Sequence, residues 1–441
     1  MKKIVIIALR FIFVLLLVVI PVHAQPTKVW VDDDGPDNGI DQFDTIQEGI
    51  NAVAIGGTVH VASGTYAETL SIGKALALTG NGRDTTIIDA GGSGPVIGLT
   101  ADHVTVSGLT MQNWAGGSAN SGAIYGTFNN CTIAENRFKG TIGRGDYGLW
   151  TSGGSNTVTE NMFTDIGDYA GDAGGPAIKF GTGAGSYNIV RQNQIIDSRG
   201  GIWIYGGGHH DIFNNVINSN RCGIFFFASA NNEVHDNEFS GNIDAIQVWH
   251  SSSNPNIIRG NTIMSNADDG IEFWYGAGSF SWGIHYNDIY DNGDHGVVGG
   301  ECNATKNWWS DASGPSGGVT DPITGILAEG EGDRIGVNVH FDPWAEIPYF
   351  ADLPEPEPAV LPAALIQQFY GLSIVNIASG GTFAVQDGIE VGMLSLERGT
   401  HTIEVGVSNI GLLDAHNVSL KINAPEGMKI EISPKSTTIE R

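Results

Sequence analysis

An asparagine recurs at a nearly fixed interval through the middle of this chain. It stands at Asn193, Asn215, Asn237, Asn261 and Asn287, so the successive gaps are 22, 22, 24 and 26 residues. Each asparagine is followed eight or nine residues later by a small residue and a short apolar run. A period of this length, with short β-type runs separated by Gly and Asn, is typical of a β-solenoid. Helical repeats are longer and have a 3.6-residue period, which is absent here.

The repeat also predicts which side chains point inward. The apolar runs that follow the asparagines are Gly201–Ile204, Gly223–Phe226, Ala245–Val248, Gly270–Phe273 and Gly296–Val298, and weaker copies of the repeat begin at Asn136, Asn161 and Asn307. Side chains alternate between the two faces of a strand, so every second residue of a run points into the solenoid. An unpaired buried amide costs about 1–3 kcal/mol. We therefore expect each interior asparagine to bond the backbone of the next coil.

The ends of the chain differ from the repeat. Residues 1–24 have the basic start, apolar centre and small-residue cleavage site of a secretion signal, and their apolar run is short for a membrane anchor. Residues 25–349 hold the solenoid. Residues 350–362 form a Pro/Glu linker, and residues 363–441 alternate apolar and polar positions like a small, incomplete β-sandwich. The signal predicts a secreted or cell-surface protein, extracellular or periplasmic.

A short helix is expected near the start of the solenoid. Thr45-Ile46-Gln47-Glu48 has the form of a capping box, and Gly56-Gly57 would end the helix. Ile46, Ile50 and Val53 fall on one helical face. Such an amphipathic helix would cover the open end of the solenoid, which otherwise exposes unpaired backbone groups.

Composition excludes several classes of function. The formal net charge is −27, whereas phosphate binding needs clustered Lys and Arg, so a nucleic acid is not an expected partner. The cysteines Cys131, Cys222 and Cys302 are too far apart to suggest a zinc site or a disulfide scaffold, and buried packing is their expected role. The motifs of esterases, zinc proteases and phosphate-binding loops are absent from the sequence.

Several segments carry a resemblance to a known group of proteins. They are Asp44–Ile50, Val61–Tyr66, the Asn and Gly-Ile repeats, and Asn307-Trp308-Trp309. Over roughly residues 28–349 the chain resembles the secreted right-handed parallel β-helix proteins of the pectin-lyase-like superfamily, and most of all their surface and periplasmic repeat proteins. The tail is similar to immunoglobulin-like modules of cell-surface proteins. The resemblance implies an all-β, right-handed parallel β-helix, but that superfamily includes lyases, hydrolases, epimerases, adhesins and helpers of metal-enzyme maturation.

Four aromatic residues are predicted to line up on the outside of the solenoid. If Ile202 and Ile204 point inward, the alternation places Tyr205 outward, and the same phase places Phe227, Trp249 and Trp274 outward on the next three coils. Coils stack about 4.8 Å apart, so the four rings would form a ladder. Sugars stack on such rings, which makes these residues candidates for substrate binding. The alternative is that a long turn or the C-terminal module covers the rings.

Charged residues flank this aromatic ladder. Counted by coil, those before each strand are Arg199, Arg221, Asp244, Asp268-Asp269 and Asp294-His295, and outward strand positions add Lys179, His250 and Glu272. Carboxylates one coil apart approach the 5–5.5 Å spacing of retaining glycosidases, and two coils apart the inverting spacing. Crowding of like charges would raise one pKa and so give an acid and a base. The candidate catalytic residues are Asp244, Asp269, Asp294, His295 and Arg221, and the candidate substrate-binding residues beside the rings are Glu272, Lys179 and Arg199.

The same carboxylates allow a second chemistry. Asp244, Asp269 and Glu272 could hold Ca²⁺, which takes several oxygen ligands. By analogy with the superfamily's lyases, the ion would neutralise a uronic-acid carboxylate while Arg221, Arg199 or Lys179 removes the adjacent proton. Asp268-Asp269 followed by Asp294-His295-Gly296 also resembles polygalacturonase motifs, although that family's Asn-Thr-Asp and Arg-Ile-Lys elements are absent. The plain alternative is that Asp before Gly-Ile only supports a turn.

Two further clusters are weaker candidates. Asp32-Asp33-Asp34 could bind Ca²⁺ or form a solvated turn, and His209-His210-Asp211 could bind a transition metal or fill an ordinary turn position. Taken together, the sequence favours a monomer that binds and cleaves an extracellular polysaccharide as a lyase or glycoside hydrolase. A non-catalytic surface protein or adhesin, associated with a cell surface through its C-terminal module, is the alternative. A periplasmic maturation factor for metalloenzymes is a third, disfavoured for copper by the scarcity of Met and Cys.

Overall fold

A computed structural model describes residues 24–349, except for 93, 115–121, 142–146, 168–173, 182–184, 250–254 and 275–279, together with six strands between 372 and 439. The predicted secretion signal lies outside the described residues, apart from Ala24. The predicted linker, residues 350–362, lies outside them completely, as does His250. The predicted sandwich at 363–441 is described only for the backbone of the six strands, so it stays a prediction.

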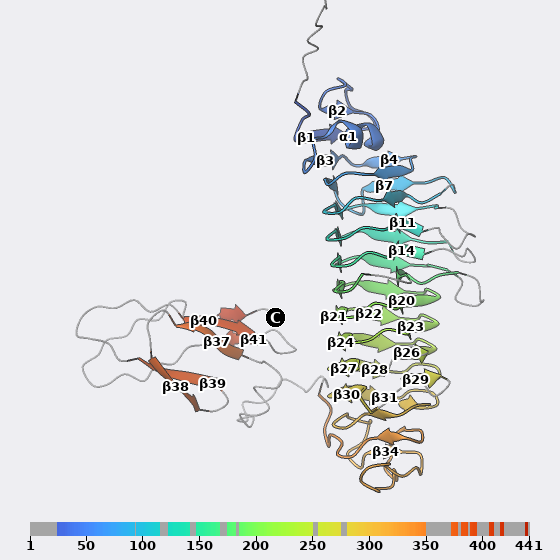
Figure 1. Ribbon diagram of the computed structural model, residues 1–441, viewed down its shortest axis with the longest axis vertical. Coiled ribbons are helices and arrows are strands. Elements are labelled where there is room, and N and C mark those ends of the chain that lie inside the picture. The colour runs from blue at the N-terminus through green and yellow to red at the C-terminus, as the bar shows by residue number, and fades with distance from the viewer. Residues whose placement is uncertain are drawn as a thin grey trace, which may run out of the picture.

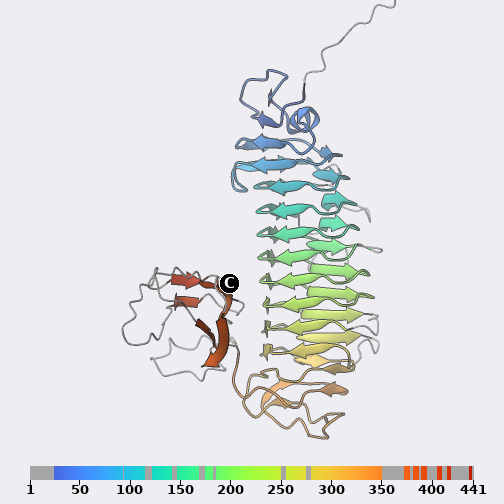
Figure 2. The ribbon, with the colours of Figure 1, turned by 60° about the vertical axis from the view of Figure 1, so that its left-hand side comes forward.

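The chain between residues 24 and 349 is a parallel β-solenoid with three long sheets (Figures 1 and 2). From β3 to β32 the strands fall into sheet 1, sheet 2 and sheet 3 in strict rotation, so each coil gives one strand to each sheet. All neighbours within these three sheets pair in parallel. The expected all-β solenoid is therefore confirmed, with very little helix.

The strands are short, as the Gly- and Asn-punctuated repeat predicts. Sheet 1 consists, in spatial order, of β2 (Gln42–Phe43), β1 (Lys28–Val31), β3 (Thr58–Val61), β6 (Ala77–Gly80), β9 (Thr105–Ser107), β12 (Thr132–Ala134), β15 (Thr157–Thr159), β18 (Ile189–Arg191), β21 (Asp211–Phe213), β24 (Glu233–His235), β27 (Ile257–Arg259), β30 (Gly283–His285), β33 (Cys302–Asn303) and β36 (Val339–His340). Sheet 2 consists of β4 (Gly64–Tyr66), β7 (Thr86–Asp89), β10 (Thr110–Gln112), β13 (Arg137–Lys139), β16 (Met162–Thr164), β19 (Gln194–Ile196), β22 (Val216–Asn218), β25 (Glu238–Ser240), β28 (Thr262–Met264) and β31 (Asp288–Tyr290). Sheet 3 consists of β5 (Leu70–Ile72), β8 (Ile97–Leu99), β11 (Gly122–Gly126), β14 (Tyr147–Thr151), β17 (Ile178–Phe180), β20 (Gly200–Tyr205), β23 (Cys222–Phe227), β26 (Asp244–Trp249), β29 (Ile271–Trp274) and β32 (Val297–Val298).

The remaining strands form separate pairs. β34 (Pro315–Ser316) and β35 (Gly332–Arg334) pair in parallel after the last full coil. The strands of the tail pair antiparallel, β37 with β40, β38 with β39 and β41 with β42; they are β37 (Leu372–Ile377), β38 (Gly381–Gln386), β39 (Ile389–Leu394), β40 (Val405–Asn409), β41 (Ala415–Val418) and β42 (Thr437–Ile439).

One helix, α1 (Ile46–Ala52), lies at the N-terminal end of the stack (Figure 1). The side chain of its N-cap, Thr45, accepts a hydrogen bond from the Glu48 backbone amide at 3.3 Å, as the capping box predicts. At Gly49 the helix approaches β1 closely, since an added Cβ would lie 2.8 Å from Val31. Its role as a cap stays a prediction. Within the described part of the chain, no helix has the length and hydrophobicity needed to cross a bilayer.

The interior of the coils is a continuous apolar core that runs from Val29 to Phe341. Equivalent positions of successive coils stack there; the rings of Phe138 and Phe163, for example, lie 4.3 Å apart and nearly parallel. The three cysteines are free and buried, as expected, and Cys131 and Cys302 belong to this core.

The predicted asparagine ladder is present at the bend between sheets 1 and 2. Asn215, for example, accepts hydrogen bonds on its Oδ1 from the backbone and side-chain amides of Asn193, at 3.0 and 2.9 Å. Its own Nδ2 donates to Val190 O and to Asn237 Oδ1, each at 2.9 Å. Equivalent contacts connect the members of the ladder, which are Asn136, Asn161, Asn193, Asn215, Asn237, Asn261, Asn287 and Asn307.

Two more ladders, which were not predicted from the sequence, occupy the other bends. One precedes the strands of sheet 1 and consists of Cys131, Asn156, Asn188, His210, Asn232 and Asn256. The other precedes the strands of sheet 3 and consists of Ser198, Asn220, Asn242, Asn266, Asn292 and Asp333. In both, a different residue type interrupts the run of asparagines, so the spacing alone is less visible in the sequence.

His210 takes an asparagine position in its ladder, and this predicts a pH-dependent stability. The ring is stacked on Phe180 at 4.9 Å, its Nε2 finds no hydrogen-bond partner in the described part of the chain, and burial lowers the pKa of His210 to about 4. The unfolded chain therefore binds a proton below pH 6.5 that the folded chain does not bind until about pH 4. We expect stability to fall as the pH drops through this window, by up to roughly 3 kcal/mol.

The substitution His210→Asn should remove this pH-dependent loss, because an asparagine fits the ladder and does not titrate. Urea unfolding at pH 7 and pH 4.5 measures the effect, with His209→Asn as the matched control, since the neighbouring His209 lies outside the core and stacks on Tyr187. An equal acid-induced loss in the wild type and in His210→Asn would contradict the prediction.

Candidate functional site

The outward face of sheet 3 carries the predicted aromatic column. The strand pairing places Tyr205 beside Phe227, Phe227 beside Trp249, and Trp249 beside Trp274. The intervening residues, such as Ile204 and Val248, are fully buried, so the rings point away from the core as the alternation predicts. The four rings therefore lie in one column on four successive coils.

The rings pack on one another and do not form a flat platform. Tyr205 and Phe227 are stacked at 5.1 Å, but Phe227 meets Trp249 at 6.2 Å with an angle of 82° between the rings, and Trp249 meets Trp274 at 5.9 Å and 65°. Trp274 is 39% exposed, whereas the other three side chains are half-buried. The column thus offers ring edges and partly covered faces, with Trp274 as its most accessible member.

A second outward column lies beside the first on the same sheet. Successive register partners in it are Tyr125, Trp150, Lys179, Trp203, Phe225, Gln247 and Glu272. Tyr125 and Trp150 stack at 4.5 Å, and the Lys179 ammonium lies over the ring of Tyr205 at 4.6 Å. Tyr125 and Trp150 were not predicted from the sequence, because their coils carry the weaker copies of the repeat.

Three carboxylates meet at the start of the strands. Asp244, Asp269 and Glu272 each place one oxygen so that all three atoms lie within 4.8 Å of one another. Asp244 and Asp269 are 6% and 5% exposed. Gln247, which the sequence analysis did not include in the site, donates hydrogen bonds from Nε2 to Asp244 Oδ2 at 2.9 Å and to Glu272 Oε2 at 3.1 Å. The backbone amide of Asp269 also donates to Asp244 Oδ1, at 3.2 Å.

Burial and like charge raise the pKa of both aspartates. Burial is the largest cause for Asp244 and brings its pKa to about 7. The pKa of Asp269 also rises to about 7, first through burial and then through the negative charges of Asp268, Glu272 and Asp244. Near neutral pH the pair therefore holds about one proton between its two carboxyl groups.

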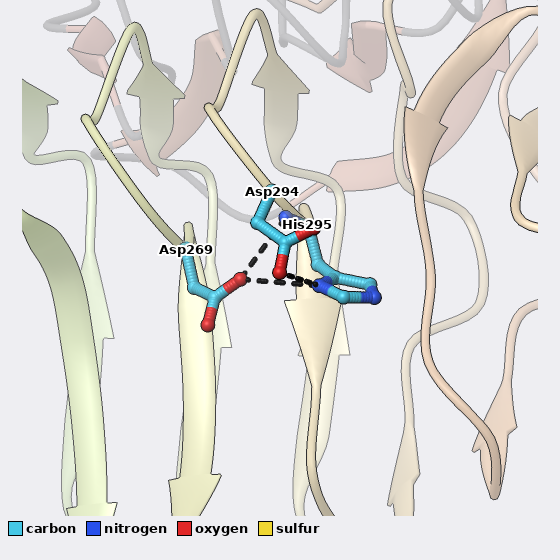
Figure 3. A group of neighbouring side chains, drawn as sticks. All are labelled: Asp269, Asp294 and His295. Atoms are coloured by element: carbon cyan, nitrogen blue, oxygen red, sulfur yellow. Dashed lines mark hydrogen bonds and ion pairs between the residues drawn. The ribbon is translucent and has the colours of Figure 1, made fainter.

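Asp269 belongs to a second group together with Asp294 and His295 (Figure 3). The His295 ring points its Nδ1 at both carboxylates, 3.3 Å from Asp269 Oδ1 and 3.2 Å from Asp294 Oδ2. The His295 backbone amide donates to Asp269 Oδ1 at 3.0 Å. Asp294 Oδ1 lies 3.3 Å from Nη1 of Arg334, a residue that the sequence analysis did not single out.

The basic residues are placed differently from the prediction. Register pairs Asp244 with Cys222, and the amide of Asp244 donates to the Arg221 carbonyl, so Arg221 stands one position before the column of the aspartates. Its positive charge still acts on Asp244 and offsets a small part of the rise in the pKa of that carboxyl, which burial dominates. The predicted alignment of Arg199 and Arg221 with Asp244 on successive coils was wrong. Each arginine precedes the inward isoleucine of its strand by three residues, whereas Asp244 precedes its isoleucine by two.

Arg199 and Lys179 are engaged away from the carboxylates. Arg199 donates to the carbonyl of Gly174 and lies over the Trp203 ring at 5.1 Å. Lys179 donates to the hydroxyl of Tyr147 at 3.2 Å. Both belong to coils two and three steps before that of Asp244.

The two weaker metal candidates do not come together. His210 is in the interior ladder, His209 stacks on Tyr187, and Asp211 bonds His235 at 2.9 Å. The metal-binding alternative for His209-His210-Asp211 is therefore wrong. Among the described residues, Asp32-Asp33-Asp34 also forms no group of metal-ligating atoms.

Part of the chain matches a known family. Residues 96–258, less than half of the chain, match the family described as right handed beta helix region. Similar solved structures include a PL6 family polysaccharide lyase from Pseudopedobacter saltans (12% identity, 67% of this chain and 91% of that chain covered, TM-score 0.40). Another is the catalytic unit of a thermostable GH87 alpha-1,3-glucanase from Streptomyces thermodiastaticus (14%, 73% and 70%, TM-score 0.40). A third is a tailspike protein of an E. coli bacteriophage in complex with a pentasaccharide (11%, 71% and 71%, TM-score 0.42). A search among curated proteins found no match.

Proposed function

We propose that this protein binds an extracellular polysaccharide along the outward face of sheet 3 and cleaves it at the Asp244–Asp269 pair. One observation carries the proposal: two buried carboxyl groups with raised pKa values stand at the start of the strands that carry the aromatic column. Secretion to the exterior or the cell surface is part of this proposal and rests on residues 1–24.

The binding part of the proposal rests on the rings. The C–H faces of sugars are apolar and pack on aromatic rings, while their hydroxyl groups bond polar neighbours such as Gln247 and Glu272. Asp244 and Trp249 are five residues apart on β26, which at 3.3 Å per residue is roughly 16 Å. A sugar chain that reaches both must therefore run along the strands, across the solenoid.

The cleaving part rests on the aspartate pair. A pair that shares about one proton can protonate the glycosidic oxygen from one carboxyl group while the other attacks as a nucleophile or activates water. One oxygen of Asp244 and one of Asp269 lie within 4.8 Å of each other, a close approach that is compatible with the retaining spacing of two carboxyl groups. Hydrolysis is favoured over elimination because Arg199 and Lys179, two of the three bases considered for a lyase, are engaged two and three coils away.

Calcium is compatible with the same carboxylates. Asp244, Asp269 and Glu272 offer only oxygen ligands, as Ca²⁺ prefers, and two of them are buried. When bound there, the ion would supply positive charge beside an acidic sugar, and Arg221, whose charge acts on Asp244, is the remaining candidate base for a proton transfer. A requirement for Ca²⁺ would mark this lyase form of the proposal.

A polysaccharide panel tests the proposal. The purified protein is incubated with neutral and acidic polysaccharides, with Ca²⁺ or with chelator, while ultraviolet absorbance and reducing ends are followed. New reducing ends without absorbance indicate a hydrolase, and absorbance of an unsaturated uronate indicates a lyase. Binding without cleavage would contradict the proposed cleavage. If the protein neither bound nor cleaved any polysaccharide, both parts of the proposal would be contradicted.

Trp249→Ala should weaken polysaccharide binding about tenfold, because Trp249 contacts both neighbouring rings of the column, Phe227 and Trp274. Affinity electrophoresis in gels containing the polysaccharide measures the change. The matched control is Trp30→Ala on sheet 1, since Trp30 is 54% exposed and also packs against a neighbouring ring, that of His60. If the polysaccharide slowed the migration of the wild type and of Trp249→Ala equally, the sugar would bind at a face other than sheet 3.

A non-catalytic glycan-binding surface protein is the second candidate. The observation that favours it is the edge-on packing of Phe227, Trp249 and Trp274, which covers part of the ring faces and gives the solenoid a rigid outer strip. In that case Asp244 and Asp269 would only stabilise the turns at the start of β26 and before β29.

A further inference from the structure

We propose that Asp269, Asp294 and His295 form a binding site for a divalent transition-metal ion such as Zn²⁺ (Figure 3). The site differs from the oxygen-only group of Asp244, Asp269 and Glu272 because it includes an imidazole nitrogen. It shares Asp269 with that group. Metal binding there does not require that the protein act on a polysaccharide.

The orientation of the His295 ring is the first observation. Its Nδ1 is shielded from solvent and has no hydrogen-bond partner among the described residues, although it lies 3.3 and 3.2 Å from two carboxylate oxygens. Neither contact has the geometry of a hydrogen bond. A proton on Nδ1 points in one direction and can bond only one of these two oxygens well, whereas a cation placed between the three atoms contacts all of them.

His235 shows what an ordinary histidine between two aspartates looks like in the same protein. Its Nε2 bonds Asp211 Oδ1 at 2.9 Å and its Nδ1 bonds Asp236 Oδ2 at 2.7 Å. Both ring nitrogens are therefore used in hydrogen bonds. His295 instead directs a single nitrogen at two carboxylates, which is the arrangement that a shared ion would satisfy.

The spacing of the ligand atoms agrees with one ion. Zinc lies about 2.0–2.1 Å from imidazole nitrogen and about 2.0–2.2 Å from carboxylate oxygen, so two of its tetrahedral ligands are roughly 3.4 Å apart. The Nδ1 contacts of 3.3 and 3.2 Å are close to that value, and all three ligand atoms lie within 4.8 Å of one another. The nitrogen ligand selects zinc and related ions over Ca²⁺ and Mg²⁺.

Neighbouring groups hold two of the ligands in place. The backbone amide of His295 donates to Asp269 Oδ1, and Arg334 Nη1 lies 3.3 Å from Asp294 Oδ1, which leaves Oδ2 directed at the ring. Such outer contacts orient metal ligands. The side chains of His295 and Asp269 are 13% and 7% exposed, whereas that of Asp294 is 53% exposed, so the site is closed on the core side and open to solvent at Asp294.

Isothermal titration calorimetry with Zn²⁺ alone tests the site, on chelator-stripped protein that carries no polyhistidine tag. We expect one saturable site in the wild type. His295→Ala and Asp294→Asn should each weaken Zn²⁺ binding at least tenfold. Circular dichroism and the melting temperature establish that each variant is folded, and Asp294 is exposed enough that its replacement leaves the coils intact.

Two control variants distinguish this site from the protein's other histidine and carboxylate groups. His235→Gln removes a histidine held by two aspartates elsewhere and should leave Zn²⁺ binding unchanged. Glu233→Gln removes a carboxylate on sheet 1 that pairs with Arg259 and should also leave it unchanged. The proposal is overturned if the wild type shows no saturable Zn²⁺ binding, or if His295→Ala and Asp294→Asn bind as tightly as the wild type. Because no polysaccharide is present, neither result bears on the proposed cleavage.

Discussion

Asp269→Asn is expected to reduce polysaccharide cleavage by roughly 10²–10⁴-fold while binding stays nearly unchanged. Asparagine has nearly the same shape as aspartate. Its Oδ1 can still accept the hydrogen bond that the His295 backbone amide donates to Asp269 at 3.0 Å. What is lost is the proton that Asp269 shares with Asp244, because an amide neither donates an acidic proton nor carries the charge of a base. The initial rate of reducing-end release measures the change.

The matched control for this variant is Asp211→Asn. Asp211 lies on sheet 1 and bonds His235, so the same change of charge occurs on a different face of the solenoid. It should leave the rate within about twofold. Wild-type rates in both Asp244→Asn and Asp269→Asn would show that the aspartates only support the turns before their strands.

Asn237→Ala should cost the solenoid roughly 3–6 kcal/mol of unfolding free energy. Asn237 accepts hydrogen bonds from the backbone and side-chain amides of Asn215, at 3.0 and 2.9 Å, and donates to Ile212 O and Asn261 Oδ1, at 2.9 and 3.0 Å. Alanine would leave the buried backbone amide of Asn215 without this partner, at about 1–3 kcal/mol, and would remove three further hydrogen bonds, each worth about 0.5–1.5 kcal/mol. Urea unfolding followed by circular dichroism measures the loss.

Asn218→Ala provides the comparison for the ladder. Asn218 lies on β22, one coil before Asn237. Its side chain is half-buried, and among the described residues it donates a hydrogen bond to Glu238 Oε1 at 3.4 Å and accepts one from the Ser240 amide at 3.3 Å. We expect a loss of about 1 kcal/mol or less there. If the two variants were equally stable, the interior ladder could not be what holds successive coils together.

The sequence predicted the solenoid and the aromatic column for one physical reason. Parallel coils repeat the same residue positions, so the inward isoleucines fix the phase of each strand and place Tyr205, Phe227, Trp249 and Trp274 in register. The first asparagine ladder followed from the same spacing. The other two ladders were missed because Cys131, His210, Ser198 and Asp333 replace asparagine in them.

The detail of the site depended on side-chain contacts that a repeat pattern does not specify. Outward rings can stack flat or edge-on, and only the rotamers decide that Trp249 meets its neighbours edge-on. The bridging role of Gln247 and the pairing of Arg334 with Asp294 connect residues from different coils or from outside the repeat. The arginines were misaligned by one residue, which is enough to move a side chain out of a column.

A crystal structure of the Asp269→Asn variant with an oligosaccharide from a bound polysaccharide tests the central claim most directly. The account predicts sugar density on the outward face of sheet 3, running along the strands from Asp244 toward Trp249 and Trp274. Sugar density confined to sheet 1 or sheet 2, with the face of sheet 3 bare, would contradict it.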